Sequence, residues 1–426
     1  MPVTVVVGLQ WGDEGKGRIV DYLSRGADAV ARFGGGANAG HTVRVGEETY
    51  KLRIVPSGVV AGVSQCIIGP GAVVSPSGLL AELATLNRCG VDTSGVWLSD
   101  LAHLIMPYHV EMDRALEKDR AEGALGTTGN GIGPAYADRV ARCGMRAGDL
   151  RDLASCQAIL ERRKVPLQQI GISLDLNSIA MQLAALADSL LPHVCDTIAL
   201  LHQTLRGGGR ILAEGAQGTM LDVGLGTYPY VTSSVTVAGG ASAGLGFGPK
   251  HVEHVVGVVK AYSTRVGSGP LPTELAGTEG ETLRTRGAEV GVVTGRPRRC
   301  GWLDLPALKY AAQINGATHL ALTKLDVLDD LERIPVCTAY RTGSPASLPF
   351  AIEAGAQPQC ESLPGWNGTI GSVRTWSELP HNARSYVAYL EQYIGLPVSY
   401  ISVGPERSQI IVRGGAPLVP RVAASA

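Results

Sequence analysis

The chain has 426 residues, which is long enough to bury a large core and allows two or three domains. Its 37 basic and 38 acidic residues leave a formal net charge of −1, so no overall field favours nucleic acid or an anionic membrane, and any anion site has to be local. The 8 cysteines form no C-x-x-C pair and no segment holds about 18 uninterrupted apolar residues, so we expect a soluble, cytoplasmic protein with reduced thiols.

An apolar, β-branched run at residues 3–7 leads into a glycine-dense turn. Apolar residues then recur at helical spacing from Ile19, so the stretch predicts a strand, a loop and a helix. Such a junction directs backbone N–H groups and a helix N-terminus at one point, which suits a phosphate. The alternative is a tight turn that carries only surface charges.

The loop at residues 8–18 is not a Walker A motif. Gly17 follows Lys16, where that motif needs a Ser or Thr for magnesium. Asp13 is therefore the candidate metal ligand of this loop, and it is also a candidate base.

Strands and helices alternate along the next part of the chain. We predict strands at 29–33, 66–69 and 96–99, a hairpin of 42–45 with 49–52, a helix that Ser77 caps and that runs to about residue 88, and a helix from about residue 107 to 122. This alternation is typical of an α/β fold with a mainly parallel central sheet covered by helices.

Residues 149–205 have a helical pattern, broken near Pro166 and Pro192, and hold no concentration of chemically useful side chains. We expect an insertion that supports the site or a subunit contact. Strands at 210–213, 255–262 and 319–323 and helices at 303–315 and 383–393 are predicted to follow. Because the chain shows no repeat and no clear linker, we expect residues 1–426 to form one domain, with 149–205 as its helical insertion.

Five glycine-rich loops follow apolar runs or separate elements, at residues 8–18, 34–42, 126–134, 214–233 and 291–299. In an open parallel sheet, the loops at the carboxyl ends of the strands converge on one crevice. Several polar loops of this kind predict one large polar ligand, or more than one.

Three of these segments carry candidate functional side chains. His41 stands with Asn38 and Thr42 in a loop of small residues, which favours an acid or hydrogen-bond donor near a phosphate over a structural histidine. The arginines of residues 294–299 suit a carboxylate or a phosphate, and a solvated charge run is the alternative. At residues 323–326 an Asp can accept from a guanine while a Lys stem covers the ring.

Together, in this order and over nearly the whole chain, these motifs resemble the adenylosuccinate synthetase family. The matching stretches are QWGDEGKG at 10–17, NAGHT at 38–42, GTTG at 126–129, GIGP at 131–134, EGAQGT at 214–219, GTYPYVTSS at 226–234, TRVG at 264–267 and TKLDVL at 323–328. The resemblance implies a P-loop-NTPase-like core with large loop and helical insertions. It also implies a magnesium-dependent ligase of the AMP branch of purine biosynthesis, which couples GTP hydrolysis to the joining of IMP with L-aspartate.

The resemblance implies a two-step mechanism. Asp13 takes the proton from purine N1 and binds magnesium, with the Gly40 carbonyl as a second metal ligand. The purine O6 attacks the γ-phosphoryl group of GTP while His41 acts as an acid, with Lys16 and Gln217 completing the catalytic set. The aspartate amine then displaces phosphate at C6 of the 6-phosphoryl-IMP intermediate.

Carried over by motif, the resemblance also implies the binding residues. Those for GTP are Gly12, Asp13, Glu14, Gly15, Lys16, Gly17, Arg18, Gly40, His41, Thr42, Arg298, Lys324, Leu325, Asp326, Ser402, Val403 and Gly404. Those for IMP are Asn38, Ala39, Thr128, Arg142, Gln217, Thr232, Val266 and Arg296, of which Arg142 reaches in from a partner subunit, so a homodimer is implied. Those for the amino acid are Val292, Val293, Thr294, Gly295, Arg296, Pro297 and Arg298.

The sequence departs from the family pattern at several positions. Asn130 stands where Arg is usual and Val293 where Thr is usual, and each removes a polar contact near the implied amino-acid pocket. The others are Ala37, Gly224, Leu225, Val235 and Val403.

These departures leave alternatives open. We favour the ordinary purine enzyme over a specialised paralogue that aminates an IMP analogue or takes another amino donor. A GTP-binding module without catalysis is a further alternative, against which the presence of Asp13, Lys16 and His41 argues. A nucleic-acid-binding protein has little support from a net charge near zero.

Overall fold

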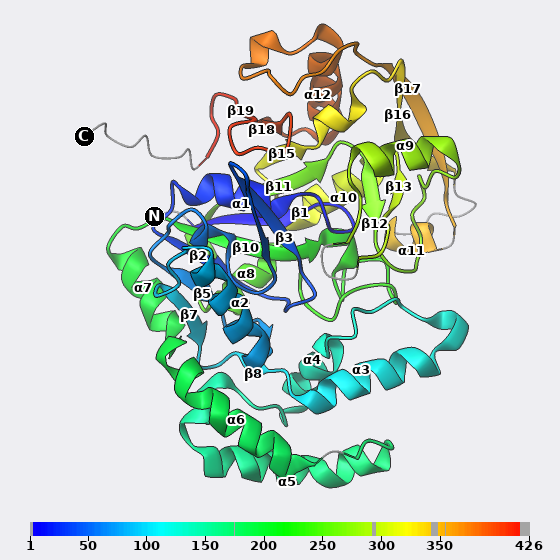
Figure 1. Cartoon of the computed structure of the whole chain (residues 1–426). Coiled ribbons are helices and arrows are strands. Elements are labelled where there is room, and N and C mark those ends of the chain that lie inside the picture. The colour runs from blue at the N-terminus through cyan, green and yellow to red at the C-terminus, as the bar shows by residue number, and fades with distance from the viewer. Residues whose placement is uncertain (1–2, 174, 292–294, 342–347, 354, 418–426) are drawn as a thin grey trace.

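The core of the molecule is a sheet built around strand β1 (Val3–Gly8), and the computed structural model describes residues 3–173, 175–291, 295–341, 348–353 and 355–417. Ten strands form this sheet in the order β19-β18-β15-β11-β1-β10-β2-β5-β7-β9 (Figure 1). All neighbouring pairs are parallel except β18 with β19. The other nine strands are β2 (Ala29–Arg32), β5 (Cys66–Ile68), β7 (Val96–Ser99), β9 (Val194–Cys195), β10 (Ile211–Gly218), β11 (Val252–Lys260), β15 (His319–Thr323), β18 (Val398–Ser402) and β19 (Ile410–Val412).

Helices and smaller sheets surround this sheet. The helices are α1 (Lys16–Ser24), α2 (Pro76–Arg88), α3 (Pro107–Asp119), α4 (Ile132–Ala141), α5 (Leu153–Gln169), α6 (Leu176–Leu190), α7 (Thr197–Arg206), α8 (Gly239–Leu245), α9 (Thr278–Arg286), α10 (Leu305–Asn315), α11 (Leu348–Glu353) and α12 (His381–Ile394). The smaller sheets pair β3 (His41–Val45) with β4 (Glu48–Leu52), β6 (Val73–Val74) with β8 (His103–Leu104), β12 (Ser263–Arg265) with β13 (Arg299–Gly301), and β14 (Leu303–Asp304) with β16 (Arg333–Arg341) and β17 (Gln357–Pro364).

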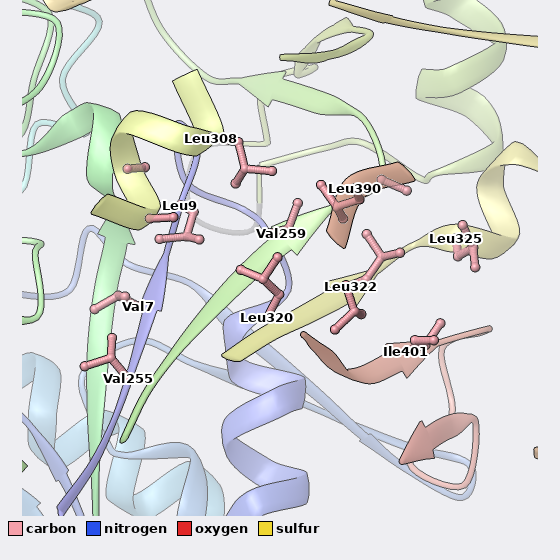
Figure 2. Close-up of a cluster of buried hydrophobic side chains, with 14 of the residues drawn as sticks. Val7, Leu9, Val255, Val259, Leu308, Leu320, Leu322, Leu325, Leu390 and Ile401 are labelled. Carbon is pink, nitrogen blue, oxygen red and sulfur yellow. The ribbon is translucent and has the colours of Figure 1, made fainter. Parts of the chain in front are cut away.

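Strand β1 is buried on both of its faces. Val5 and Val7 belong to the hydrophobic cluster that contains residues of α7, α10 and α12, whereas Val6 packs in a separate cluster with Ile19 and Val20 of α1. Figure 2 shows part of the first cluster, where Leu308 of α10 and Leu390 of α12 lie among side chains of β11 and β15. Because successive side chains of a strand point to opposite faces, a nearly continuous apolar run is needed to fill both layers.

The predicted α/β fold is confirmed, with a mainly parallel sheet between helices. The predicted hairpin is present as β3 and β4, and β7 and β15 have the predicted bounds. Among the described residues, no helix is both long and apolar enough to cross a membrane.

The predicted cap of α2 is wrong. The Ser75 hydroxyl, not that of Ser77, accepts a hydrogen bond from the Gly78 N–H, at 3.2 Å. Pro76 occupies the first turn, where a missing N–H costs nothing, so the helix begins two residues before the position that we predicted.

The helical pattern is broken near Pro166, as predicted, but the break comes after the proline and not at it. Pro166 lies inside α5, and the chain turns after Gln169, at Gly171, whose φ is +77°. Arg162 and Pro166 are exposed, so water can solvate the carbonyl group that the proline leaves without its helical partner. The predicted break near Pro192 is confirmed, since α6 ends at Leu190 and a short 3-10 turn (Leu191–His193) follows.

Replacement of Ser75 by alanine tests the assignment of this cap. Ser75→Ala should lower the free energy of unfolding by about 1 kcal/mol, because the Gly78 N–H loses its acceptor, and should speed hydrogen exchange at that amide. Ser77→Ala is the matched control, and its effect should be less than about 0.5 kcal/mol. Equal effects of the two substitutions on the urea unfolding midpoint would contradict the assignment.

Candidate active site

The loops at the carboxyl ends of the central strands surround one large cavity with a volume of about 1030 Å³. Residues that follow β1, β2, β10, β11, β15 and β18 all line its wall, as the crossover geometry of an open parallel sheet requires. The convergence of glycine-rich loops that the sequence predicts is therefore present, and the volume is large enough for more than one small ligand.

Most of the predicted site residues lie on the wall of this cavity. They are Gly12, Asp13, Gly15, Lys16, Gly17, Arg18, Asn38, Ala39, Gly40, His41, Thr42, Thr128, Gln217, Thr232, Val266, Arg298, Lys324, Asp326, Ser402 and Gly404.

Three other predicted residues, Glu14, Leu325 and Val403, are buried beside the cavity without lining it. Within the described part of the chain, Arg142, Gly295, Arg296 and Pro297 also lie off its wall. Val292, Val293 and Thr294 lie outside the described residues.

The first glycine-rich loop is organised by Glu14, which is fully buried. Its carboxylate accepts hydrogen bonds from the backbone N–H groups of Gln10 and Gly12, at 3.1 and 2.9 Å, and pairs with Lys16 Nζ at 2.6 Å. Glu14 therefore shapes the loop and orients Lys16, and its side chain does not face the cavity. Lys16 also begins α1, so a helix N-terminus opens onto the same space.

His41 lies at the start of β3, directly beside α1. A Cβ atom on Gly17 would come within 2.6 Å of His41 Cβ, so glycine is needed for this close approach. His41 Nδ1 donates to the buried Glu214 carboxylate, which also accepts from the Ser57 hydroxyl and the Ser57 N–H, both at 2.8 Å. Burial lowers the pKa of the imidazole, while the adjacent Glu214 opposes this shift.

Sequence reasoning assigned no function to Glu214 or Ser57. Glu214 follows the apolar run Ile211–Ala213 inside β10, and a single acid in a fully buried strand was the signal that could have marked it. Ser57 lies in a short 3-10 turn far from His41 in sequence, and nothing local distinguishes it.

Asp13 faces the cavity beside Arg298. The Arg298 Nε atom lies 2.8 Å from Asp13 Oδ2, and the Asp13 side chain is 28% exposed, against 9% for Arg298. The other side of the Arg298 guanidinium pairs with the buried carboxylate of Glu289. The predicted cation of the 291–299 loop thus lies next to the candidate base of the first loop.

At another part of the wall, Asp326 presents a buried Oδ1 atom that has no hydrogen-bond partner among the described residues. Burial raises the pKa of Asp326, and Lys324 and Arg18 oppose this shift. Lys324 Nζ donates to the Gly287 carbonyl at 2.6 Å, and Arg18 Nη1 donates to Ser402 Oγ at 2.7 Å. Four segments that are distant in sequence therefore form one polar recess.

Two of the predicted IMP-binding residues contact each other. Asn38 Nδ2 donates to Thr232 Oγ1 at 3.4 Å, which joins two of the loops. Gln217 Nε2 is buried and has no hydrogen-bond partner among the described residues, which leaves one donor available at the cavity wall.

Left-handed backbone occurs at several of the predicted site residues. Among the described non-glycine residues, seven have positive φ, and four of these are predicted site residues, namely Asp13, Arg142, Gln217 and Lys324. Left-handed geometry is costly for residues with a Cβ atom and persists where function requires it.

The remaining predicted residues lie at the edge of the site. Arg296 Nη2 donates to the carbonyl groups of Gly126 and Thr127, at 3.1 and 2.8 Å, and so ties the 291–299 loop to the GTTG segment. Asn130 carries a buried Nδ2 without a partner among the described residues. Arg142 is exposed at the end of α4.

Comparisons with known proteins agree with this geometry. The family model of adenylosuccinate synthetase matches residues 5–411. Adenylosuccinate synthetase of Moorella thermoacetica is 48% identical over 97% of this chain and 99% of that protein, and the enzyme of Halothermothrix orenii is also 48% identical, over 96% and 98%.

Solved structures give the same result. Fully ligated adenylosuccinate synthetase from Plasmodium falciparum superposes with a TM-score of 0.91, at 36% identity, over 97% of this chain and 100% of that one. Succinoaminodeoxyadenylate synthetase of cyanophage S-2L, solved with dGMP and dATP, has a TM-score of 0.62 at 20% identity over 96% and 95%, which shows a shared fold. The match over nearly the whole length, in sequence and in structure, places this chain in the adenylosuccinate synthetase family.

Proposed function

We propose that the large cavity is where this chain joins IMP to L-aspartate at the expense of GTP, giving adenylosuccinate, GDP and phosphate. The observation that carries the proposal is the convergence of Asp13, His41 and Asp326 on one cavity, since these side chains supply a base, an acid and a guanine acceptor. The chain is thus a ligase of purine biosynthesis, which uses soluble substrates, and we place it in the cytoplasm. Relatives at 48% identity carry the name of the ordinary enzyme and give no support to a paralogue that acts on an IMP analogue.

In the first step, Asp13 removes the proton from N1 of the purine. The electrons move to O6, which bonds to the γ-phosphorus atom of GTP while the bond to the GDP oxygen breaks. Phosphoryl transfer chiefly needs alignment and neutralisation of charge. Lys16, at the N-terminus of α1, and His41 supply positive charge at the cavity wall, and Gln217 holds the purine with its buried amide.

In the second step, the aspartate amine attacks C6, the C6–O6 bond breaks, and the phosphate leaves with the proton that the amine gives up. Conversion of O6 into a phosphate ester turns a poor leaving group into a good one. Residues Val292–Arg298 bind the aspartate carboxylates in this proposal, because the planar fork of an arginine matches a carboxylate. Arg296 and Arg298 are then its cationic contacts.

We further propose that the active enzyme binds magnesium. Asp13 and the Gly40 carbonyl would hold the ion, and both residues line the cavity. They fit this ion, because magnesium takes few protein oxygens and completes its coordination with phosphate oxygens and water. When bound, it would neutralise charge on the transferring phosphoryl group.

His41 is suited to its role by the carboxylate behind it. Glu214 accepts a hydrogen bond from the Nδ1–H group, so Nε2 is the atom that carries or releases the second proton. A buried negative charge at Glu214 also balances the imidazolium, which burial alone would disfavour.

The recess around Asp326 fits the guanine of GTP. Its unpartnered carboxylate oxygen can accept from the ring N–H and the exocyclic amine, and the Lys324 stem can cover the ring face. Ser402–Gly404 and Arg18 close the recess.

We also propose that the active form is a homodimer in which Arg142 of one chain reaches the IMP of the other. Its exposed side chain and left-handed backbone support this proposal. Residues 1–426 then act as one domain, in which the helices of 149–205 brace α2, since α6 contacts α2.

Two substitutions, each of which replaces a carboxylate by a neutral amide, test the catalytic role and the guanine-binding role separately. Asp13→Asn should lower kcat by about 10³-fold, because the base is lost, and keep the KM for GTP within about tenfold. Asp326→Asn should do the reverse, with a KM for GTP raised by about 10²-fold and a kcat within about threefold, because an amide replaces one acceptor oxygen by a donor. Steady-state GDP formation with IMP and aspartate measures both. Near-normal turnover of Asp13→Asn would refute the role of Asp13.

Replacement of Glu214 tests the proposed role of His41 as the acid. Glu214→Gln should lower kcat by about 10²-fold and move the alkaline limb of the kcat–pH profile to lower pH, because the imidazolium loses its counter-charge and its pKa falls. Glu82→Gln is the control, since Glu82 is a half-buried acid that accepts from the backbone N–H groups of Arg53, Ile54 and Val55 and not from His41. An unmoved alkaline limb in Glu214→Gln would exclude His41 as the acid.

Mixed dimers test the shared site. Arg142→Leu should raise the KM for IMP, and equal mixing with Asp13→Asn should restore about one quarter of wild-type activity, because half of the dimers are mixed and each has one complete site. Mixing Arg142→Leu with the Arg142→Leu, Asp13→Asn double variant gives no complete site and is the control. Verified mixed dimers without recovered activity would refute sharing.

A further inference from the structure

Glu289 is a buried acid that neither the motifs nor the two reaction steps use. It follows α9, is fully buried and does not line the cavity. Its backbone carbonyl accepts from the Arg298 N–H at 2.9 Å, so Glu289 and Arg298 lie side by side. The proposed contact of Arg298 with the amino acid therefore depends on the geometry at this point.

Three donors converge on the Glu289 carboxylate. Lys260 Nζ lies 3.1 Å from both oxygens, the Tyr262 hydroxyl donates to Oε1, and Arg298 Nη1 donates to Oε2 at 2.5 Å. Lys260 also donates to Thr264 Oγ1 at 2.7 Å. The carboxylate thus has partners on both oxygens, and its own position is set by β11 and the residues that follow it.

Arg298 is held from two sides. Its Nη1 atom faces Glu289, away from the cavity, and its Nε atom faces Asp13, which lines the cavity. A guanidinium group is planar, so the hydrogen bond from Nη1 to Glu289, together with the ion pair to Asp13, sets the orientation of the whole group.

The charge on Glu289 is stable at neutral pH. Burial works against ionisation, but Lys260 and Arg298 outweigh it and lower the pKa of Glu289 to about 2. Removal of the carboxylate would leave the buried Lys260 without its ion-pair partner and Arg298 with Asp13 alone.

We propose that Glu289 is a positioning residue of the ligase reaction, which holds the Arg298 guanidinium in the single orientation that faces both Asp13 and the aspartate substrate. The inference rests on the proposed roles of Asp13 and Arg298. Glu289 touches no substrate, and its effect on the reaction passes through Arg298.

A double-mutant cycle measures this dependence. Glu289→Gln keeps the shape of the side chain and should lower kcat/KM for aspartate by about tenfold or more in the wild-type background. In an Arg298→Leu background the same substitution should change kcat/KM by less than about threefold, because the group that Glu289 orients is gone. Equal losses in both backgrounds would overturn the proposal, since a structural defect would act in both.

Asp304→Asn is the matched control of the cycle. Asp304 is also buried and accepts a tyrosine hydroxyl, from Tyr340, but it caps α10 and contacts neither Arg298 nor Asp13 in the part of the chain that the structure describes. Its effect should be the same with and without Arg298→Leu.

If Glu289→Gln does not fold, the Lys260→Met, Glu289→Gln variant takes its place, because it removes the buried lysine charge together with the carboxylate. A loss that largely disappears in the Arg298→Leu background would again support the proposal, and equal losses in both backgrounds would overturn it.

A second measurement does not need activity. In arginine-detected NMR of the ligand-free protein, with the signal assigned by its loss in Arg298→Leu, the Arg298 guanidinium should rotate slowly in the wild type and at least about tenfold faster in Glu289→Gln. Unchanged rotation would overturn the positioning role. A wild-type protein that shows slow rotation but forms no adenylosuccinate would instead refute the proposed function and leave the positioning of Arg298 intact.

Discussion

In each of the first, second and last glycine-rich loops, one basic side chain at the cavity wall is held by a buried glutamate. Lys16 pairs with Glu14, His41 with Glu214 and Arg298 with Glu289, and all three glutamates are fully buried. A buried carboxylate is costly unless a cation and further donors satisfy it, so each of these acids has several partners. The result is a set of basic side chains whose orientation is fixed before any phosphate arrives, which is the condition for efficient electrostatic catalysis.

The glycines beside these acids are needed because the buried carboxylates leave no room for a side chain there. A Cβ atom on Gly8 would come within 2.3 Å of Glu14 Oε2, and one on Gly218 within 2.4 Å of Glu14 Oε1. A Cβ atom on Gly287 would come within 2.9 Å of Glu289 Oε1. A site that buries charged side chains against backbone leaves no room for other side chains, and this explains part of the high count of 56 glycines.

Local patterns predicted the elements well where one interaction dominates. The β1 strand and the β3–β4 hairpin were found because apolar periodicity and a short polar turn determine them. The cap at Ser75 and the continuous helix through Pro166 were missed, because a proline at a first turn and a proline on a solvated face are both tolerated for reasons that depend on the surroundings. Most of the residues that the motifs indicated line the cavity, but Glu214, Ser57 and Glu289 were given no role.

The sequence by itself determined the family, the alternation of strands and helices, and the loops that bring Asp13, His41 and Asp326 to one end of the sheet. These follow from short-range patterns and motifs, which need no knowledge of distant contacts. Only the tertiary structure decided which acid pairs with each basic side chain. Glu214 is 173 positions from His41, and Lys260 and Glu289 are 29 positions apart, so their pairing depends on the order of strands in the sheet. No local pattern encodes that order, because it is set by how the helices and strands pack over the whole chain.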